Sequence, residues 1–266
     1  MTPDDIAPKT EAGYRSRWGR FSPAMGWKAF WSEIVIVVLG VVIALAANEA
    51  VQNWSWQNKV RDGEVRLQSD LSYVFTVAAE QVVIAPCAEA QLSALSQKLV
   101  KSGSVWDPVT VHVDDGTSIR WVIRIPARSQ MFPVWDSLVA DGTAARFPQD
   151  RQVIYGNISA RITRAQNQSD EANQLVRRLL ALGHPMVLSD DTRRYFLVMT
   201  EEIRALIDVS ELSAKQRMVS IAGSREAKVS ATEAKQVETY LKESGTIKFC
   251  KAQGLPLANW RDALKQ

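Results

Sequence analysis

The side chains best suited to chemistry in this sequence are two cysteines, Cys87 and Cys250, and two histidines, His112 and His184. Both cysteines follow an apolar segment near the N-terminus, and an even count there is typical of one disulfide in an oxidising compartment. Two unrelated buried thiols are the alternative, since free cysteine often packs as a small apolar side chain. This inventory excludes a zinc ribbon or a multi-histidine metal centre within one chain, so we expect no metal and no cofactor.

Neither histidine has the setting of a general base, which needs an aligned partner. His112 falls in the middle of a predicted strand, in the solvent-facing register, and His184 falls in a Gly-His-Pro helix stop. The sequence also lacks the G-x-S-x-G, H-E-x-x-H and G-x-x-x-x-G-K-[ST] motifs, and no G-x-G-x-x-G follows a strand. We therefore predict that the chain is not an enzyme.

The remaining charged pairs have a structural interpretation. Asp190-Asp191 suits the first turn of a helix, where the helix dipole favours acidic side chains. Arg177-Arg178 and Arg193-Arg194 can meet an anionic ligand, but solvated arginines are the usual case. The 32 basic and 29 acidic residues give a net charge of +3, which is too mild to predict a nucleic-acid partner.

An apolar segment dominates the N-terminal part of the chain. Ile34–Ala47 contains no polar side chain, and the wider window Ala29–Val51 contains polar residues only in its end turns. Four tryptophans flank it, two on each side: Trp27, Trp31, Trp54 and Trp56. Indole rings favour the membrane interface, and Trp31 to Trp54 spans roughly 34 Å, close to a hydrocarbon core of about 30 Å. The segment predicts one transmembrane helix over residues 29–51.

Two alternatives to a membrane anchor remain open. A run of this length also occurs in buried core helices. It also suits the apolar region of a cleaved signal peptide, with Ala44-Leu45-Ala46 as a small-residue cleavage site. The long preceding segment favours the anchor, as does the absence of proline and glycine between Gly40 and Gly63.

The charges on either side of this segment bear on its orientation. Four basic residues lie within reach of the membrane before it and three after it, which is a weak positive-inside bias: Arg15, Arg17, Arg20 and Lys28, and then Lys59, Arg61 and Arg66. The two cysteines add to the argument, because a disulfide needs an oxidising compartment. Together they predict a cytoplasmic tail over residues 1–28 and an extracytoplasmic domain over residues 52–266. The predicted location is the bacterial inner membrane, crossed once, with the domain in the periplasm.

Within the segment, Gly40, Ala44 and Ala47 share one helix face. Small residues at this spacing let two membrane helices approach closely, which predicts a homodimer face. A lipid-facing stripe is the alternative. Glu33 and Glu49 lie at the two ends of the span, where solvation at the interface is the simpler interpretation.

The predicted fold class is mainly α: the membrane helix continues into an antiparallel helical bundle with a small β-hairpin insertion. Residues 49–85 form one long helix that Pro86 should kink or end. Alternating apolar residues over 109–113 and 119–125, joined by the turn residues Asp114–Ser118, predict the hairpin at about 109–125. In it Ile119, Trp121, Ile123 and Ile125 face the helices, while Arg120 and Arg124 face water.

Four further helices follow the hairpin. The first covers Val134–Ala140, the second begins at Pro148 and ends at Gly183, the third is capped by Ser189 and runs to about Gly223, and the fourth begins at a Ser230–Glu233 capping box and ends at Gly245.

Two segments resemble an uncharacterised bacterial family of single-pass inner-membrane proteins of unknown function. They are Ser32–Glu49, with Gly40 in its middle, and Phe132–Ile162, with a Ser137-Leu138-x-x-x-Gly142 turn before a helix that carries Tyr155. The resemblance implies an N-terminal membrane helix and a helical extracytoplasmic domain, and it implies no catalytic residue.

These observations favour a membrane-anchored binding or scaffolding module that contacts the lipid bilayer and another envelope protein or a second copy of itself. The alternative is a small-ligand sensor of the four-helix-bundle type. An exposed apolar patch would favour the scaffold, and a pocket with convergent polar groups would favour the sensor.

Overall fold

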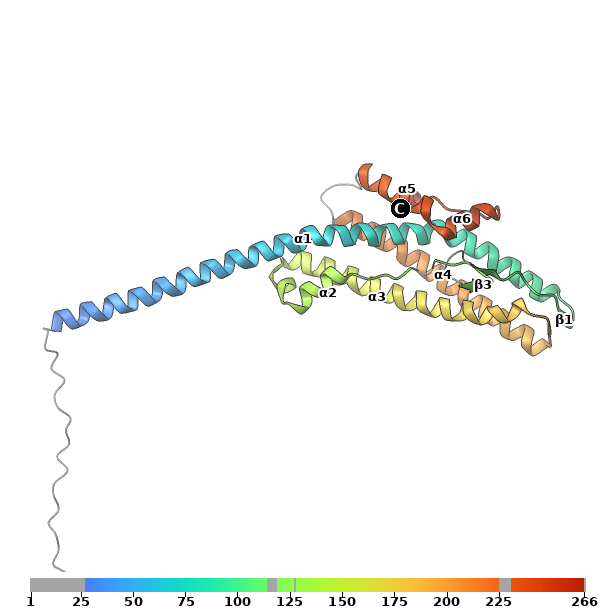
Figure 1. Cartoon of the computed structure of the whole chain (residues 1–266), viewed down its shortest axis with the longest axis horizontal. Helices are drawn as coiled ribbons and strands as arrows, with labels where there is room; N and C mark the ends of the chain where they lie inside the picture. The colour runs from blue at the N-terminus through green and yellow to red at the C-terminus, as the bar shows by residue number, and fades with distance from the viewer. Residues whose placement is uncertain (1–26, 114–118, 127, 225–230, 266) are drawn as a thin grey trace, which may run out of the picture. The chain divides into compact units, whose positions relative to one another are not determined.

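A computed structural model describes residues 27–113, 119–126, 128–224 and 231–265 (Figure 1). The chain divides into two units, Met1–Ser55 and Trp56–Gln266. The predicted fold class is confirmed: the protein is mainly α, with antiparallel helices and small two-stranded sheets.

The described part of the first unit belongs to α1, Trp27–Lys101, a helix of 75 residues that continues into the second unit. From Phe30 to Ser55 every side chain is exposed. By length and composition, α1 is the one helix of the described chain that could cross a membrane, and its most apolar window is not buried. A buried core helix does not fit this exposure, whereas a membrane helix and a signal sequence both fit it.

In the second unit, α1 is the central element. An apolar stripe recurs on it at steps of three, four or seven residues and is buried along Leu67, Leu71, Val74, Ala78 and Val82. α1 does not end at Pro86, one of the two outcomes that the sequence allowed there.

Two features explain why the helix continues through Pro86: the buried packing around it, and a hydrogen bond from the C-terminal segment. Proline removes one N–H and disturbs the preceding turn. Val83, Ile84 and Cys87 are buried on either side of it, and the Val83 carbonyl accepts a hydrogen bond from the Ala258 N–H at 3.0 Å. The C-terminal segment therefore stabilises the disturbed turn.

The predicted hairpin is present but short. β2, His112–Val113, pairs antiparallel with β3, Arg120–Trp121, in the register His112 to Trp121. The turn Asp114–Ser118 lies outside the described residues. Trp121, Ile123 and Ile125 are buried as predicted, but Ile119 is exposed because the strand begins after it.

A second small sheet was not predicted. β1, Val105–Trp106, pairs antiparallel with β4, Met186–Val187. Each strand has two residues, which is too short for an alternating pattern to be visible in the sequence.

The later helices follow the predicted order, and their bounds differ by a few residues. They are α2, Pro133–Ala140; α3, Gln149–Arg178; α4, Asp190–Ser224; α5, Ala231–Glu243; and α6, Gly245–Ala252. Short 3-10 helices cover Thr143–Arg146, Leu179–Gly183 and Trp260–Leu264. Ser230 lies outside the described residues.

The prediction that Gly245 ends the fourth helix was wrong in one respect. α5 ends at Glu243, and Gly245 is the first residue of α6. The Ser244 side chain caps α6 by accepting the Ile247 N–H at 3.3 Å. A serine cap can start a new helix immediately, so the glycine here does not mark a long loop.

The core consists of two clusters stacked along α1. One surrounds Phe75, Trp135, Tyr155 and Trp260, and the other surrounds Trp106. α3 and α4 pack against each other, and α4 runs antiparallel to α1 (Figure 1). Three contacts fix this direction: Arg193 to Leu99, Arg204 to Glu89, and Arg217 to Gln81.

Candidate functional site

The two cysteines form a disulfide. The Cys87 and Cys250 sulfur atoms are 2.07 Å apart, and their Cα atoms are 6.1 Å apart. Both side chains are fully buried, and 163 residues separate them in sequence. The bond joins α6 to the turn of α1 that contains Pro86. Both sulfur atoms are used in this bond, so no described thiol is left free to act as a nucleophile.

Among the candidate membrane residues, Gly40, Ala44 and Ala47 are exposed on α1, and a Cβ atom on Gly40 would meet nothing within 4 Å. The structure therefore leaves this face open. Trp27 and Trp31 are exposed, with ring centroids 6.3 Å apart.

The two tryptophans after the apolar segment differ from each other. Trp54 is exposed, whereas Trp56 is half-buried in the second unit. The Lys59 ammonium lies 4.4 Å and the Arg146 guanidinium 5.2 Å from the Trp56 ring centroid. Trp56 therefore has protein contacts, and its role as an interface anchor stays a prediction.

His112 is half-buried, whereas the prediction placed it in the solvent-facing register. Its ring stacks on Trp121 at 4.5 Å and lies 5.3 Å from Phe249. The hairpin packs this face onto α6, which turns His112 into part of an aromatic cluster. His184 is exposed after the second 3-10 helix.

The charged pairs mostly stabilise helix ends. Asp190 and Asp191 occupy the first turn of α4, and the Ser189 hydroxyl accepts the Thr192 N–H at 3.2 Å. Arg193 donates to the carbonyl of Leu99 in the last turn of α1 and to the carbonyl of Gly103 just after the helix. These contacts confirm the predicted start of α4 and give Arg193 a structural role in place of a solvated one.

A buried carboxylate that the sequence reasoning missed lies at the centre of the second unit. Glu80 is 1% exposed, and it accepts hydrogen bonds from Arg128 Nε at 3.1 Å, from the Tyr240 hydroxyl at 3.4 Å and from the Ser244 hydroxyl. Burial raises the pKa of the Tyr240 phenol above its ordinary value, and the charge of Glu80 acts in the same direction.

The bonding of Glu80 determines what it can do. Its oxygens are occupied by three donors from separate segments, so it joins α1 to the loop before α2, to α5 and to the start of α6. This is the geometry of a structural link between these segments. The sequence held a signal: within Val74–Ala85 only Thr76, Glu80 and Gln81 are polar.

Arg217 is a second buried charge that was missed. It is fully buried in α4, and it donates to Gln81 Oε1 at 2.5 Å and to the Ser213 hydroxyl at 2.9 Å. Its Nε has no partner among the described residues. Burial lowers the pKa of Arg217 to about 10, and the charge of Arg161 acts in the same direction.

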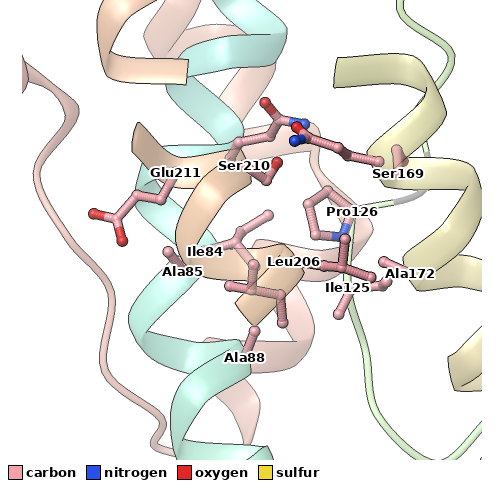
Figure 2. Close-up of a pocket in the computed structure, with 13 residues that line it drawn as sticks. Ile84, Ala85, Ala88, Ile125, Pro126, Ser169, Ala172, Leu206, Ser210 and Glu211 are labelled. Atoms are coloured by element: carbon pink, nitrogen blue, oxygen red, sulfur yellow. The ribbon is translucent and has the colours of Figure 1, made fainter. Parts of the chain in front are cut away.

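A small cavity lies between α1, α3 and α4 beside Gln81. Figure 2 shows Ile84 and Ala88 from α1, Ala172 from α3, and Leu206 and Ser210 from α4 around it. Its volume is about 40 Å³. That volume admits a few water molecules, whereas a drug-sized ligand needs roughly 300 Å³ or more.

A larger groove of about 510 Å³ lies between the hairpin and α3. Its polar lining includes Arg120, Arg124, Asp170, Asn173 and Arg177. Arg124 also donates to the Thr246 hydroxyl at 3.2 Å, and its guanidinium lies 5.0 Å from the Trp121 ring centroid. No group of three or more histidine, cysteine or acidic side chains in the described ranges could hold a metal ion.

An exposed row of residues runs along α4 in the second unit. We call it the α4 stripe and define it as Tyr195, Val198, Glu202, Ala205, Val209, Leu212, Gln216 and Val219. All eight are exposed, and six of the eight are apolar or aromatic. They alternate at steps of three and four, whereas the buried face of α4 uses other positions, such as Phe196, Met199 and Ile203. This second apolar row has the same period as the buried face and is visible in the sequence.

Comparisons with protein-family models, with curated proteins and with solved structures find no match for this chain. The resemblance noted in the sequence therefore stays a prediction.

Proposed function

We propose that this protein is a membrane-anchored binding or scaffolding module whose helical domain lies outside the cytoplasm and contacts another protein through the α4 stripe. The stripe is the observation that carries the proposal. Its five largest apolar side chains are each 47–57% exposed, and together they offer on the order of 500 Å², a patch size that is often functional on a monomer.

The location is supported by two independent features. The exposed apolar part of α1 suits a bilayer, and the Cys87–Cys250 disulfide suits an oxidising compartment. In bacteria this combination corresponds to a single-pass inner-membrane protein with its C-terminal domain in the periplasm.

Fractionation of cells that produce the chain with a C-terminal tag tests the anchor. We expect the full-length protein in the membrane fraction after carbonate extraction, and digestion of the domain by protease added to spheroplasts. A shortened product that is released by osmotic shock and begins after residue 46 would show that the segment is a signal peptide.

Site-specific photocrosslinking in intact cells tests the binding surface. A photoreactive residue at Val198 or Leu212 should give a defined adduct, identified by mass spectrometry. The same residue at Asn157 or Asn167, exposed on α3, should give none. Equal crosslinking from α3 and α4, or none from either, would contradict a binding role for the α4 stripe.

The groove beside the hairpin favours a second candidate, a sensor for a small anionic ligand. Arg120 and Arg177 line it, and its volume suits a small molecule. Thermal-shift titration of the full chain with succinate and with inorganic phosphate tests this candidate. Stabilisation by either anion that is lost in the Arg120→Ala, Arg177→Ala double variant supports the sensor, and no stabilisation contradicts it.

A further inference from the structure

We propose that the partner of the α4 stripe is a second copy of this chain, and that the two α4 helices pair in parallel. This inference rests on the proposed function, and it names the partner and the geometry.

The spacing of the stripe indicates another helix as its occupant. Its eight positions follow the three-four alternation of a heptad seam, in which side chains of one helix insert between those of a facing helix. From Tyr195 to Val219 the seam is about 36 Å long, which gives eight successive layers. A flat or irregular partner surface would not require such a regular row.

The area of the stripe fits a pair of chains that are held near each other. Two copies of a patch on the order of 500 Å² bury roughly 1,000 Å² in total, the lower limit for a specific interface. A shared membrane raises the effective concentration of two anchored chains, so a contact of this size is sufficient. The open Gly40, Ala44 and Ala47 face allows the membrane helices to approach as well.

The fold favours the parallel orientation. α4 is antiparallel to α1. The C-terminal end of α4 therefore points toward the end of the second unit at which α1 enters it, at Trp56. In a parallel pair, both Trp56 ends lie at the same end of the dimer, and both chains can enter one membrane. An antiparallel pair would place these ends at opposite ends.

The charges beside the seam are compatible with a parallel pair. In heptad order, Glu201, Asp208 and Lys215 of one helix would face the uncharged Leu206, Ser213 and Ser220 of the other. Glu202 is the exception, because it would meet its own copy within the seam. Gln216 is the second polar position of the seam and carries no charge. A polar layer fixes register at a cost in stability, and two facing carboxylates repel each other, so Glu202→Leu should strengthen the dimer.

Cysteine crosslinking of the full-length protein in native membranes tests the pairing. Val198→Cys, Val209→Cys, Leu212→Cys and Val219→Cys are introduced one at a time beside the native disulfide. In a parallel pair every seam position meets its own copy, so each variant should give a disulfide-linked dimer under mild oxidation. Asn157→Cys and Asn167→Cys, exposed on α3, are the matched controls and should stay monomeric.

A second measurement addresses the affinity without relying on crosslinks. Energy transfer between labelled full-length chains in lipid vesicles should show that Leu212→Lys weakens dimerisation at least about tenfold, since it places a charge in the apolar seam. Asn167→Lys should leave it unchanged, and Glu202→Leu should tighten it. Circular dichroism of each variant verifies that the helices are intact.

The outcomes separate the dimer from the proposed function. If Val209→Cys, near the middle of the stripe, is the only one of the four variants that forms a dimer, the pair is antiparallel and the parallel pairing is overturned. Monomers at all four positions, together with photoadducts from the stripe to a different protein, would overturn the dimer and leave the scaffold standing. Monomers and no adduct from the stripe would overturn both.

Discussion

Arg217 carries a positive charge that no carboxylate among the described residues neutralises. Its guanidinium donates to an amide oxygen and a hydroxyl, both uncharged, and it is fully buried. Burying a charge is costly unless it is paired, and apolar side chains of similar volume often replace buried charges without loss of stability.

We therefore expect Arg217→Met to leave the free energy of unfolding unchanged or to raise it by about 1–2 kcal/mol. Ser213→Ala, which keeps the charge and removes one acceptor, should lower it by about 1 kcal/mol. Chemical denaturation of the detergent-solubilised chain measures both. A large loss in Arg217→Met would show that the guanidinium is neutralised by a group beyond those described.

Tyr240 makes stability depend on alkaline pH. In the unfolded chain its phenol loses a proton near pH 10, whereas burial and Glu80 raise its pKa in the folded protein. The folded state therefore holds the proton more tightly. The contribution is complete below pH 10 and is lost as the pH rises from there through the folded-state pKa.

The free energy of unfolding should consequently fall less steeply above pH 10 in Tyr240→Phe than in the parent protein. Tyr195→Phe is the control, because Tyr195 is exposed on α4. Denaturation curves at a series of pH values provide the measurement, and parallel slopes for all three proteins would contradict the assigned cause.

At the scale of elements, the hairpin and the end of the second 3-10 helix meet at Gly183. A Cβ atom on Gly183 would lie 2.2 Å from Val111 Cγ2. The Leu182 carbonyl next to it accepts hydrogen bonds from the Val109 N–H at 3.0 Å and from the Trp106 indole at 2.7 Å. The two segments are therefore held too close together for a larger residue.

Gly183→Ala should destabilise the protein by about 1–3 kcal/mol, since the stiff valine cannot move away from the new methyl group. Val111→Ala in the same chain should recover part of the loss. Gly156→Ala on α3, where a Cβ atom would meet nothing within 4 Å, should instead stabilise the protein by up to about 1 kcal/mol. Thermal denaturation of these three variants and of Val111→Ala alone measures the effects, and additive losses would exclude the Val111 contact as the cause.

The elements that the sequence predicted well are those with a long period. The buried faces of α1, α3 and α4 repeat over many turns, so Leu67, Ile158 and Ile203 were identifiable as core. The aromatic contacts of His112 were not, because they depend on α6 lying against the hairpin. Likewise, Glu80 becomes a link only when Arg128, Tyr240 and Ser244 reach it from distant segments. Such contacts depend on tertiary packing, which periodicity does not report.

At the scale of the whole molecule, the C-terminal segment is attached to α1 around the turn that contains Pro86. The Ala258 N–H bonds the carbonyl of Val83 beside Pro86, Cys250 is bonded to Cys87, and Trp260 packs on Phe75 at 5.9 Å. The three contacts act on neighbouring turns of one helix. A break in the disulfide should therefore loosen the Pro86 turn as well as the segment that follows α5.

The Cys87→Ser, Cys250→Ser double variant should lose about 2–5 kcal/mol, since the bond closes a loop of 163 residues and loop closure restricts the unfolded chain. Hydrogen exchange should become faster at α6 and around Pro86, while α3 keeps its protection until global unfolding. Alkylation of the mature protein from cells provides the control: thiols that react only after reduction demonstrate the bond. Uniformly faster exchange in α3 and α6 alike would mean that the disulfide stabilises the fold as a whole, and that the C-terminal segment has no particular role in keeping α1 continuous through its proline.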